Sequence, residues 1–536
     1  MLAVVAVLAS VGCWCLAAQA RSDGKRFTLG GTVVDSAGGR PLADVELSLQ
    51  TEKWQPAGDP VLSDAQGRFA FPGLAAGEYI LSATGSGFGT ILYGEAPDPG
   101  WVHAVHVGAD KSIVFPIVPR GTIEGVVRDE FGDPMMRAEV TAMRPLWSDG
   151  RAALRSVGQK FTDDRGRYRF ANLAPGSYVV CSNGSQTGSA PAPVQGPVDF
   201  AARVDRFYTR ACYPASPRTY QLAAGQRAQI DLAPLPASAA TVRGRVRNAP
   251  SQMGMQPPVV LEGSPESGQA MRTFLDPTGG FVFRGVAPGS YLVRFIHSYA
   301  EPDGSQELLI AEAPVDVAGA DVDGLDVTLE PAGSVEVAVH GPADGHLDLA
   351  AVNVGLRRSD FHPPPFKEPP DESGSPHFQG LSPGRYWLTT RTAEESCVQS
   401  VKLGGREVRG KPLEVAVGAA LHVDVTVSAK CGGIRARAVR DGQGIAGAKV
   451  VLLLSGTAQD PGDLMEDFAN DEGELSFFGL APGRYLLWAW AVEGKGAIAG
   501  PLSLAAVAPE AAVVEVKEGE TIPVDVPLLK DEGQAK

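Results

Sequence analysis

The phrase Gly479-Leu480-Ala481-Pro482-Gly483-Arg484-Tyr485 decides the fold, because the chain of 536 residues contains five versions of it. Each version ends in a glycine, a variable residue and a tyrosine. The other four are Gly73-Leu74-Ala75-Ala76-Gly77-Glu78-Tyr79, Asn172-Leu173-Ala174-Pro175-Gly176-Ser177-Tyr178, Gly285-Val286-Ala287-Pro288-Gly289-Ser290-Tyr291 and Gly380-Leu381-Ser382-Pro383-Gly384-Arg385-Tyr386. Successive tyrosines are 99, 113, 95 and 99 residues apart. A period of this length is one small domain, so the sequence predicts a tandem array of about five modules.

The residues around each signature phrase predict β-strands. In the first module, residues 45–49 alternate apolar and polar side chains, as a strand with one buried face does. The stretch Asp64-Ala65-Gln66-Gly67 is typical of a hairpin turn, and Phe69 and Phe71 follow it on one face. Later modules repeat this order, and no segment has a long helical period.

These patterns predict an all-β protein with one β-sandwich in each module. Short linkers containing proline, such as residues 118–120, predict a semi-rigid, elongated rod. The expected organisation is a signal peptide at 1–20, module 1 at 21–119, module 2 at 120–238, module 3 at 239–331, module 4 at 332–430, module 5 at 431–530 and a polar tail at 531–536.

Composition narrows the partners and the compartment. A net charge of −15 and the lack of a basic cluster argue against binding to nucleic acid or anionic lipid. Residues 1–16 contain no charged residue and are followed by Ala18-Gln19-Ala20, which predicts a secretory signal peptide. A buried strand, an anchor helix and lipidation at Cys13 are the alternatives. We expect an exported protein that is periplasmic, associated with the outer membrane or extracellular, with no membrane span in the mature chain.

Four cysteines follow the expected signal peptide. An even number in an exported chain indicates disulfides, and we expect the two pairs to join residues about 30 positions apart, within or between adjacent modules. No Cys-x-x-Cys pair is present, which argues against zinc ribbons and thioredoxin chemistry. The expected pairs are Cys181 with Cys212 and Cys397 with Cys431.

The module pattern resembles the carboxypeptidase regulatory-like domain. Module 2 carries the clearest version, with Gly125-Val126-Val127, Gly132-Asp133-Pro134, Ala138-Glu139-Val140 and the turn at 162–166 before its signature phrase. The resemblance implies transthyretin-like or immunoglobulin-like β-sandwiches, as in exported multi-module proteins of soil bacteria. Such domains are non-catalytic accessories, so the resemblance implies no peptidase activity.

No residue constellation predicts catalysis or a cofactor. A peptidase zinc site needs a His-x-x-Glu pair, and none of the eight histidines begins one. Acidic turns such as residues 163–166 and 321–326 fit plain hairpin turns better than calcium loops, because calcium needs six or more oxygen ligands. Catalytic, cofactor and metal residues are therefore expected to be absent.

Aromatic residues are the strongest binding signal. Tyr485, Leu487 and Ala489 are expected to face the core, so Trp488 and Trp490 occupy the opposite face of the strand. Trp387, which follows a signature tyrosine, is a third candidate for stacking on a ligand such as a sugar ring. The alternative is that a neighbouring strand, loop or module buries both faces.

Three functions remain open. The first is a non-enzymatic scaffold, adhesion or protein-interaction rod of the cell envelope. The second is carbohydrate binding through the exposed aromatic residues of the last modules. The third is an accessory subunit of an envelope enzyme or transporter. The partner is thus expected to be an envelope protein or a polysaccharide.

Overall fold

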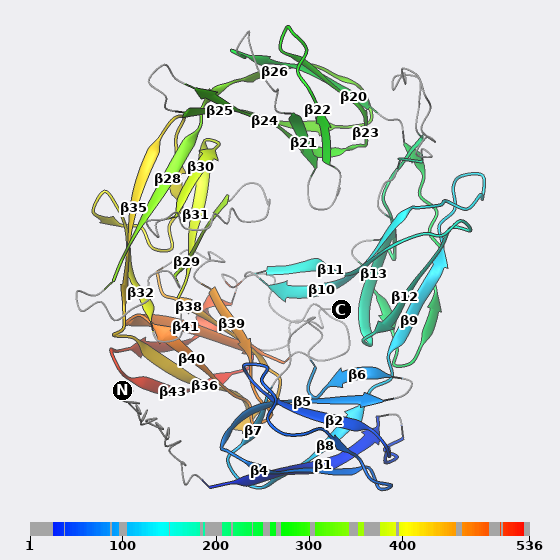
Figure 1. The fold of residues 1–536 in the computed structure, drawn as a ribbon, viewed down its shortest axis with the longest axis vertical. Coiled ribbons are helices and arrows are strands. Elements are labelled where there is room, and N and C mark those ends of the chain that lie inside the picture. Colours follow the sequence, from blue (N-terminus) through cyan, green and yellow to red (C-terminus); the bar gives the residue numbers. More distant parts are fainter. Residues whose placement is uncertain are drawn as a thin grey trace, which may run out of the picture.

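A computed structural model describes residues 25–36, 38–85, 88–95, 104–148, 151–182, 186–187, 206–215, 218–237, 240–249, 258–263, 270–300, 306–341, 352–358, 376–392, 396–456, 464–491, 504 and 507–529. The expected signal peptide at 1–20 and the tail at 531–536 lie outside these ranges. Within them the chain forms a series of two-sheet units, and the prediction of an all-β tandem array of about five sandwiches is confirmed (Figure 1).

Each module contains a rim sheet, which includes its first strand, and an inner sheet, which includes the strand of its signature tyrosine. The rim sheet of module 1 is β4 (Arg68–Leu74), β1 (Phe27–Asp35) and β8 (Lys111–Ile117). Its inner sheet is β3 (Val61–Leu62), β2 (Glu46–Thr51) and β5 (Gly77–Gly85), with β6 (Gly89–Leu92) and β7 (Val105–Val107) beside β5.

Module 2 adds a small third sheet to this plan. Its rim sheet is β12 (Arg167–Leu173), β9 (Gly121–Val126) and β18 (Arg227–Gln229). Its inner sheet is β11 (Arg151–Phe161), β10 (Glu139–Ser148) and β13 (Gly176–Ser182), with β16 (Ala211–Tyr213) and β17 (Tyr220–Leu222) beside β13. The small sheet is β14 (Gln186–Thr187), β15 (Arg206–Tyr208) and β19 (Pro236–Ala237).

Modules 3 and 4 differ from each other in which sheet is extended. Additional strands extend the inner sheet of module 3 and the rim sheet of module 4. The rim sheet of module 3 is β23 (Gly280–Val286), β20 (Ala240–Arg247) and β26 (Val322–Thr328), and its inner sheet is β22 (Ala270–Thr273), β21 (Val259–Gly263), β24 (Gly289–Ala300), β25 (Gln306–Val317) and β27 (Glu330–Pro331). The rim sheet of module 4 is β30 (His377–Leu381), β28 (Gly333–His340), β35 (Ala420–Ser428), β32 (Cys397–Leu403) and β33 (Arg406–Glu407), and its inner sheet is β29 (Asn353–Arg358), β31 (Gly384–Arg391) and β34 (Leu413–Val415).

Module 5 returns to the simpler plan. Its rim sheet is β37 (Gln443–Gly444), β36 (Gly432–Arg440), β40 (Glu474–Leu480) and β43 (Thr521–Pro527). Its inner sheet is β39 (Leu464–Phe468), β38 (Lys449–Leu454), β41 (Gly483–Trp490) and β42 (Ala512–Val516), and a short 3-10 turn, η3 (Ala508–Glu510), precedes β42.

The same strand pairing recurs in every module. The first strand lies between a strand that runs antiparallel to it and a later strand that runs parallel to it, as β1 does between β4 and β8. The equivalent parallel pairs are β9 with β18, β20 with β26, β28 with β35 and β36 with β43. Each module encloses its own apolar core between its two sheets.

The signature phrase folds the same way in all its versions. Its first residue has a positive φ, from 62° at Asn172 to 79° at Gly285, a conformation that glycine and asparagine adopt most readily. Its buried tyrosine then donates a hydrogen bond to the carbonyl oxygen four residues earlier, over 2.6–2.9 Å in the five modules. The tyrosine thus closes the turn that brings its own strand into the inner sheet.

A glycine in the first strand lets the parallel strand come close. A Cβ added at Gly125 would lie 1.7 Å from the carbonyl oxygen of Ile230 on the neighbouring chain segment. Gly31 and Gly244 are equally restricted by backbone oxygens, at 2.2 and 2.4 Å. The Gly-x-Val pattern of the sequence therefore reflects this close approach.

The modules are arranged as a closed ring rather than an elongated rod (Figure 1). Inner sheets face the middle of the ring, rim sheets lie on its outside, and module 5 contacts modules 1 and 2. The predicted elongated shape is wrong because linker composition indicates stiffness but does not determine the angle between neighbouring modules. That angle depends on contacts between module surfaces.

Two junctions have interactions that fix this angle. Between modules 3 and 4, the partly buried carboxylate of Glu312 accepts hydrogen bonds from Arg358 and, over 2.6 Å, from the hydroxyl of Ser382. Between modules 4 and 5, a disulfide joins Cys397 on β32 to Cys431, the residue immediately before β36.

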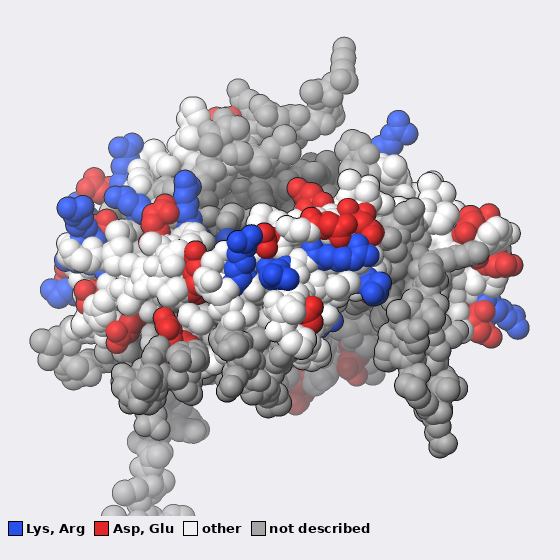
Figure 2. Space-filling view, turned by 90° about the horizontal axis from the view of Figure 1, so that it is seen from above, with Lys and Arg blue, Asp and Glu red and all other residues white. Residues whose placement is uncertain are grey.

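Charges of both signs are mixed on the face of the molecule that includes module 3. Figure 2, viewed from above module 3, shows acidic and basic side chains interspersed on that face. On the rim sheet of module 3, Arg243 lies 3.1 Å from Asp321 and 2.8 Å from Asp323. These acidic side chains are therefore paired with a neighbouring basic side chain.

Candidate functional site: the surface that closes the ring

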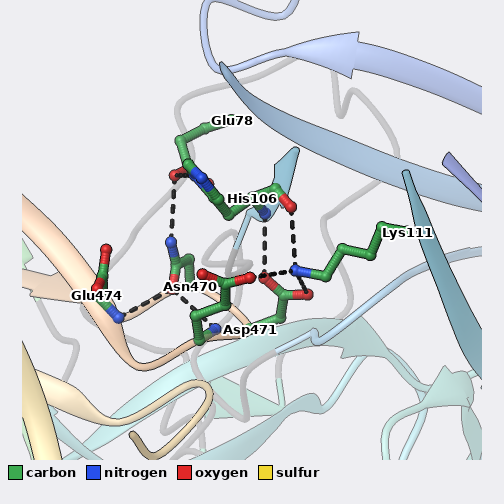
Figure 3. A network of polar contacts seen from close by, with 7 residues as sticks. Glu78, His106, Lys111, Asn470, Asp471 and Glu474 are labelled. Atoms are coloured by element: carbon green, nitrogen blue, oxygen red, sulfur yellow. Dashed lines mark hydrogen bonds and ion pairs between the residues drawn. The ribbon is translucent and has the colours of Figure 1, made fainter. Parts of the chain in front are cut away.

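The hairpin turn of module 5 forms the first part of the closing surface. Asn470 begins this turn, and its side-chain oxygen accepts hydrogen bonds from the backbone amides of Glu472 and Glu474, both over 2.9 Å. This local geometry is the one that favours Asp or Asn at the start of a turn. It directs Asp471 toward module 1 (Figure 3), and the neighbouring Glu472 also reaches Lys111 of that module.

Lys111 of β8 is the cation that meets this turn. Its ammonium lies 2.7 Å from the Asp471 carboxylate and 2.9 Å from that of Glu472, and it also donates to the carbonyl oxygen of His106 over 3.0 Å. The hydrogen bond from Lys111 holds the pKa of the Glu472 carboxyl below its usual value. Burial alone would lower the pKa of Lys111, but its hydrogen bonds to the two carboxylates raise it.

Backbone and amide hydrogen bonds add directional contacts. The backbone amide of His106 donates to Asp471 over 3.0 Å, and the backbone amide of Asp471 donates to the carbonyl oxygen of Ala104 over 3.2 Å. Glu78, from the first signature phrase, lies 2.7 Å from the imidazole Nδ1 of His106 and accepts a hydrogen bond from the Asn470 amide over 3.1 Å (Figure 3). The contact is therefore specified by shape as well as by charge.

One residue of this turn distinguishes module 5 from the other modules. Asp64, Asp163 and Asp276 begin the equivalent turns of modules 1 to 3 and accept the same two backbone hydrogen bonds. An aspartate at position 470 would place a second carboxylate 3.1 Å from Glu78, whereas the asparagine amide donates to it. The change from Asp to Asn thus adapts a turn residue to a module interface.

The β10–β11 hairpin of module 2 forms the second part of the closing surface. Trp147 near its tip packs edge-on against Trp490 of module 5, with ring centroids 4.8 Å apart. The buried ammonium of Lys449 donates to the backbone oxygen of Trp147 over 2.6 Å and lies over the Trp147 ring. An apolar contact and a charged hydrogen bond therefore hold the hairpin on the inner sheet of module 5.

Trp488 and Trp490 are buried, which is the alternative that the sequence left open for this strand. Both lie on the face opposite Tyr485, as predicted, but only 2% and 4% of their surfaces are exposed. Trp147 covers Trp490, and the indole of Trp488 donates to the carbonyl oxygen of Val507 over 2.9 Å. A hairpin from more than 300 residues earlier and the segment near η3 thus occupy the face that stacking on a sugar would require.

Trp387 has a different environment. It is half-buried on β31, directly across from Arg357 of β29 in the inner sheet of module 4. The three tryptophans are therefore not gathered in one site, since two belong to the closing surface and one lies in another module.

Both expected cysteine pairs are disulfides. Cys181 and Cys212 join the adjacent strands β13 and β16 within module 2, and Cys397 and Cys431 span the junction of modules 4 and 5. Disulfides of this kind persist in oxidising compartments, which is compatible with an exported protein.

The acidic turns are used structurally. Backbone hydrogen bonds from Arg167 and Arg165 hold the pKa of Asp163 below its usual value, although burial opposes this. Asp321 accepts a backbone hydrogen bond from Thr241 and pairs with Arg243, while Asp326 pairs with Arg247. In the described part of the chain, no three His, Cys, Asp or Glu side chains converge as metal ligands would.

Sequence reasoning missed the closing surface. The available signals were two departures from the repeat, Asn470 in place of aspartate and Lys449 where Glu46 and Glu139 stand in modules 1 and 2. Neither departure identifies its partner, because Glu78 and Trp147 lie more than 300 residues away in sequence.

Comparison with known proteins supports the domain type. Residues 28–100 match the family model of the carboxypeptidase regulatory-like domain, as the resemblance predicted. No curated protein matches the chain. Among the described residues, no helix is both long and apolar enough to cross a membrane.

Solved structures with a similar arrangement of strands are distant. The TIE protein of Bacillus anthracis is 14% identical over 73% of this chain and 69% of its own, with a TM-score of 0.16. The minor pilin of Streptococcus agalactiae is 14% identical over 39% of this chain and 96% of its own, with a TM-score of 0.22. The RrgB pilus protein of Streptococcus pneumoniae is 9% identical over 77% of this chain and 98% of its own, with a TM-score of 0.16. Such values carry no conclusion about function.

Proposed function

We propose that this protein is an exported, non-enzymatic scaffold of the cell envelope that binds protein partners at equivalent positions of several modules. The supporting observation is a large apolar side chain two residues before the hairpin turn. In modules 1 to 3 this residue is Leu62, Phe161 or Phe274, with 64%, 65% and 62% of its surface exposed. The equivalent residue of module 5, Phe468, is only 6% exposed.

Repetition is what makes these residues informative. A single exposed apolar residue is common on protein surfaces, but the same exposed position in three modules presents a regular set of contacts. In module 5, Lys449 lies over the Phe468 ring while also donating to Trp147 of module 2. At this position of module 5, Phe468 thus lies beside a side chain of its own module that contacts module 2. An accessory subunit of an envelope enzyme or transporter would use the same surface.

Photocrosslinking in the producing cell tests this function. A photoreactive phenylalanine analogue would replace Phe161 or Phe274 in the full chain, and adducts would be identified by mass spectrometry. Phe131 is the matched control, because it is 66% exposed but lies in a different turn of module 2. We expect discrete protein adducts from positions 161 and 274 in the envelope fraction. The proposal would be contradicted if neither position 161 nor position 274 gave adducts. It would also be contradicted if position 131 gave the same adducts in equal amounts.

Polysaccharide binding is a second candidate, limited to module 4. Trp387 is half-buried beside Arg357, so part of its ring is available for stacking. We then expect Trp387→Ala to abolish retention of the protein on a polysaccharide column. Trp490→Ala, which weakens the contact between modules 2 and 5, should open the ring of modules without a specific loss of retention. Equal retention of the Trp387→Ala variant and the unaltered protein removes this candidate.

A further inference from the structure

The two halves of the closing surface are formed independently of each other. Modules 1, 2 and 5 each enclose a separate core. Trp147, Lys111 and His106 are presented by folded modules 1 and 2, and Asp471 and Trp490 by folded module 5. Separating the halves therefore leaves every sandwich intact and exposes two preformed surfaces.

The two halves complement each other but not themselves. The module 1 half brings the ammonium of Lys111, and the module 5 half brings the carboxylates of Asp471 and Glu472. Two module 5 halves placed face to face would oppose carboxylates. The contact is thus heterologous, and each half can pair only with the other kind of half.

The connection between the halves is long. His106 and Asp471 are 365 residues apart in sequence, and the chain between them passes through three complete modules. The long connection sets the effective concentration of one half of the closing surface near the other half of the same chain. Ring closure within one chain is favoured over pairing between two chains only when this effective concentration exceeds the concentration of the protein. The bonds formed are the same in both cases, so a second copy satisfies the surface fully.

We propose that the closing surface also pairs two copies of this chain, each docking its module 5 on modules 1 and 2 of the other. The occupant of an opened closing surface is then a second copy rather than an unrelated protein. The exchange is reciprocal, and it requires no contact that the single chain does not already make. Cell-envelope scaffolds built from this chain would therefore be single rings or paired rings, depending on local concentration.

A charge-exchange experiment tests this proposal with the full chain. One variant carries Lys111→Glu, and the other carries Asp471→Lys with Glu472→Lys. Within either variant alone, like charges meet and closure is weakened. An equimolar mixture can form a dimer with two contacts. In one contact, the substituted position 111 of the first variant faces the substituted positions 471 and 472 of the second, so opposite charges meet. In the other contact, Lys111 of the second variant faces Asp471 of the first, as in the unaltered protein.

Light scattering after size exclusion gives the readout. We expect each variant alone to have the mass of one chain and the mixture to contain a species of twice that mass. The variant that combines all three substitutions restores complementarity within one chain and should be a monomer as compact as the unaltered protein. A mixture that stays monomeric, while scattering shows both single variants to be open, overturns the proposal.

A matched control separates this effect from general charge effects. Lys430 and Glu518 form an exposed ion pair of 3.2 Å away from the closing surface. Lys430→Glu and Glu518→Lys variants should remain monomeric alone and when mixed. Dimers in this control mixture would also overturn the proposal, because complementary charge anywhere would then be sufficient. Circular dichroism of every variant verifies that the sandwiches are folded.

Discussion

A single tyrosine hydroxyl closes each module's signature turn. In module 5, the buried hydroxyl of Tyr485 donates to the carbonyl oxygen of Ala481 over 2.8 Å. The sequence predicted this tyrosine as an inward residue from its recurrence and spacing. It did not predict the hydrogen bond, because a sequence period shows which residues are equivalent but not which atoms meet.

We expect Tyr485→Phe to lower the free energy of unfolding of module 5 by about 1–3 kcal/mol, because a buried carbonyl oxygen loses its donor. Urea unfolding followed by tryptophan fluorescence measures this loss, since Trp488 and Trp490 lie on the same strand. Tyr213→Phe is the control, because 47% of the Tyr213 surface is exposed and this substitution should change the free energy of unfolding by no more than about 0.5 kcal/mol. Identical urea midpoints for the two variants would show that the hydroxyl adds nothing.

At the scale of elements, strands and turns follow closely from the sequence. Alternation in residues 45–49 predicted β2, and the glycine-containing turns predicted the hairpins. The docking of the β10–β11 hairpin on module 5 could not be predicted from the sequence, because the residues of the hairpin indicate only that its two strands pair with each other. Trp490 is covered through a tertiary contact with Trp147. The alternation of apolar and polar residues along a strand does not indicate which distant residue makes such a contact.

The disulfide between β32 and the residue before β36 acts at the junction of two elements. Replacing Cys397 and Cys431 by serine removes a cross-link between residues 34 positions apart, worth about 4 kcal/mol in the chain-entropy model. We expect faster cleavage by a non-specific protease near residues 429–431, read by mass spectrometry of the fragments. A variant with Cys181 and Cys212 replaced should not show this cleavage, since that disulfide lies within module 2. Unchanged cleavage in the first variant would mean that the noncovalent contacts alone hold the junction.

At the scale of the whole molecule, ring closure should depend on pH. The pKa of Glu472 is lowered from its usual 4.5 by its hydrogen bond to Lys111, so its contribution is complete above about pH 4.5 and is lost as the pH falls through the lower value. The pKa of Lys111 is raised above 10.5, so its contribution is complete below that value and is lost only at more alkaline pH.

We therefore expect the radius of gyration from small-angle X-ray scattering to be larger at about pH 3 than at neutral pH. A variant with Lys111→Met and Glu472→Gln lacks this ion pair and should change less between the two conditions. Equal radii for the unaltered protein at both values would show that the apolar contact of Trp147 with Trp490 is sufficient for closure.

The number of modules and their internal plan could be predicted, but the ring could not. Five copies of a phrase determine five similar sandwiches, whereas the ring depends on contacts such as Glu312 with Arg358 that join different modules. Those contacts involve one or two residues on each side. They produce no period in the sequence.

Ring closure reverses the usual tolerance of linkers to change in length. Connections between domains ordinarily accept insertions, because the domains on either side can drift apart. Here, one additional residue in an extended linker would displace the following module by about 3.3 Å. That shift exceeds the range over which Lys111 and Asp471 can remain bonded at 2.7 Å. Length variation among natural or engineered versions of this chain should therefore accumulate in loops at the module edges, and the short connections should keep a constant number of residues.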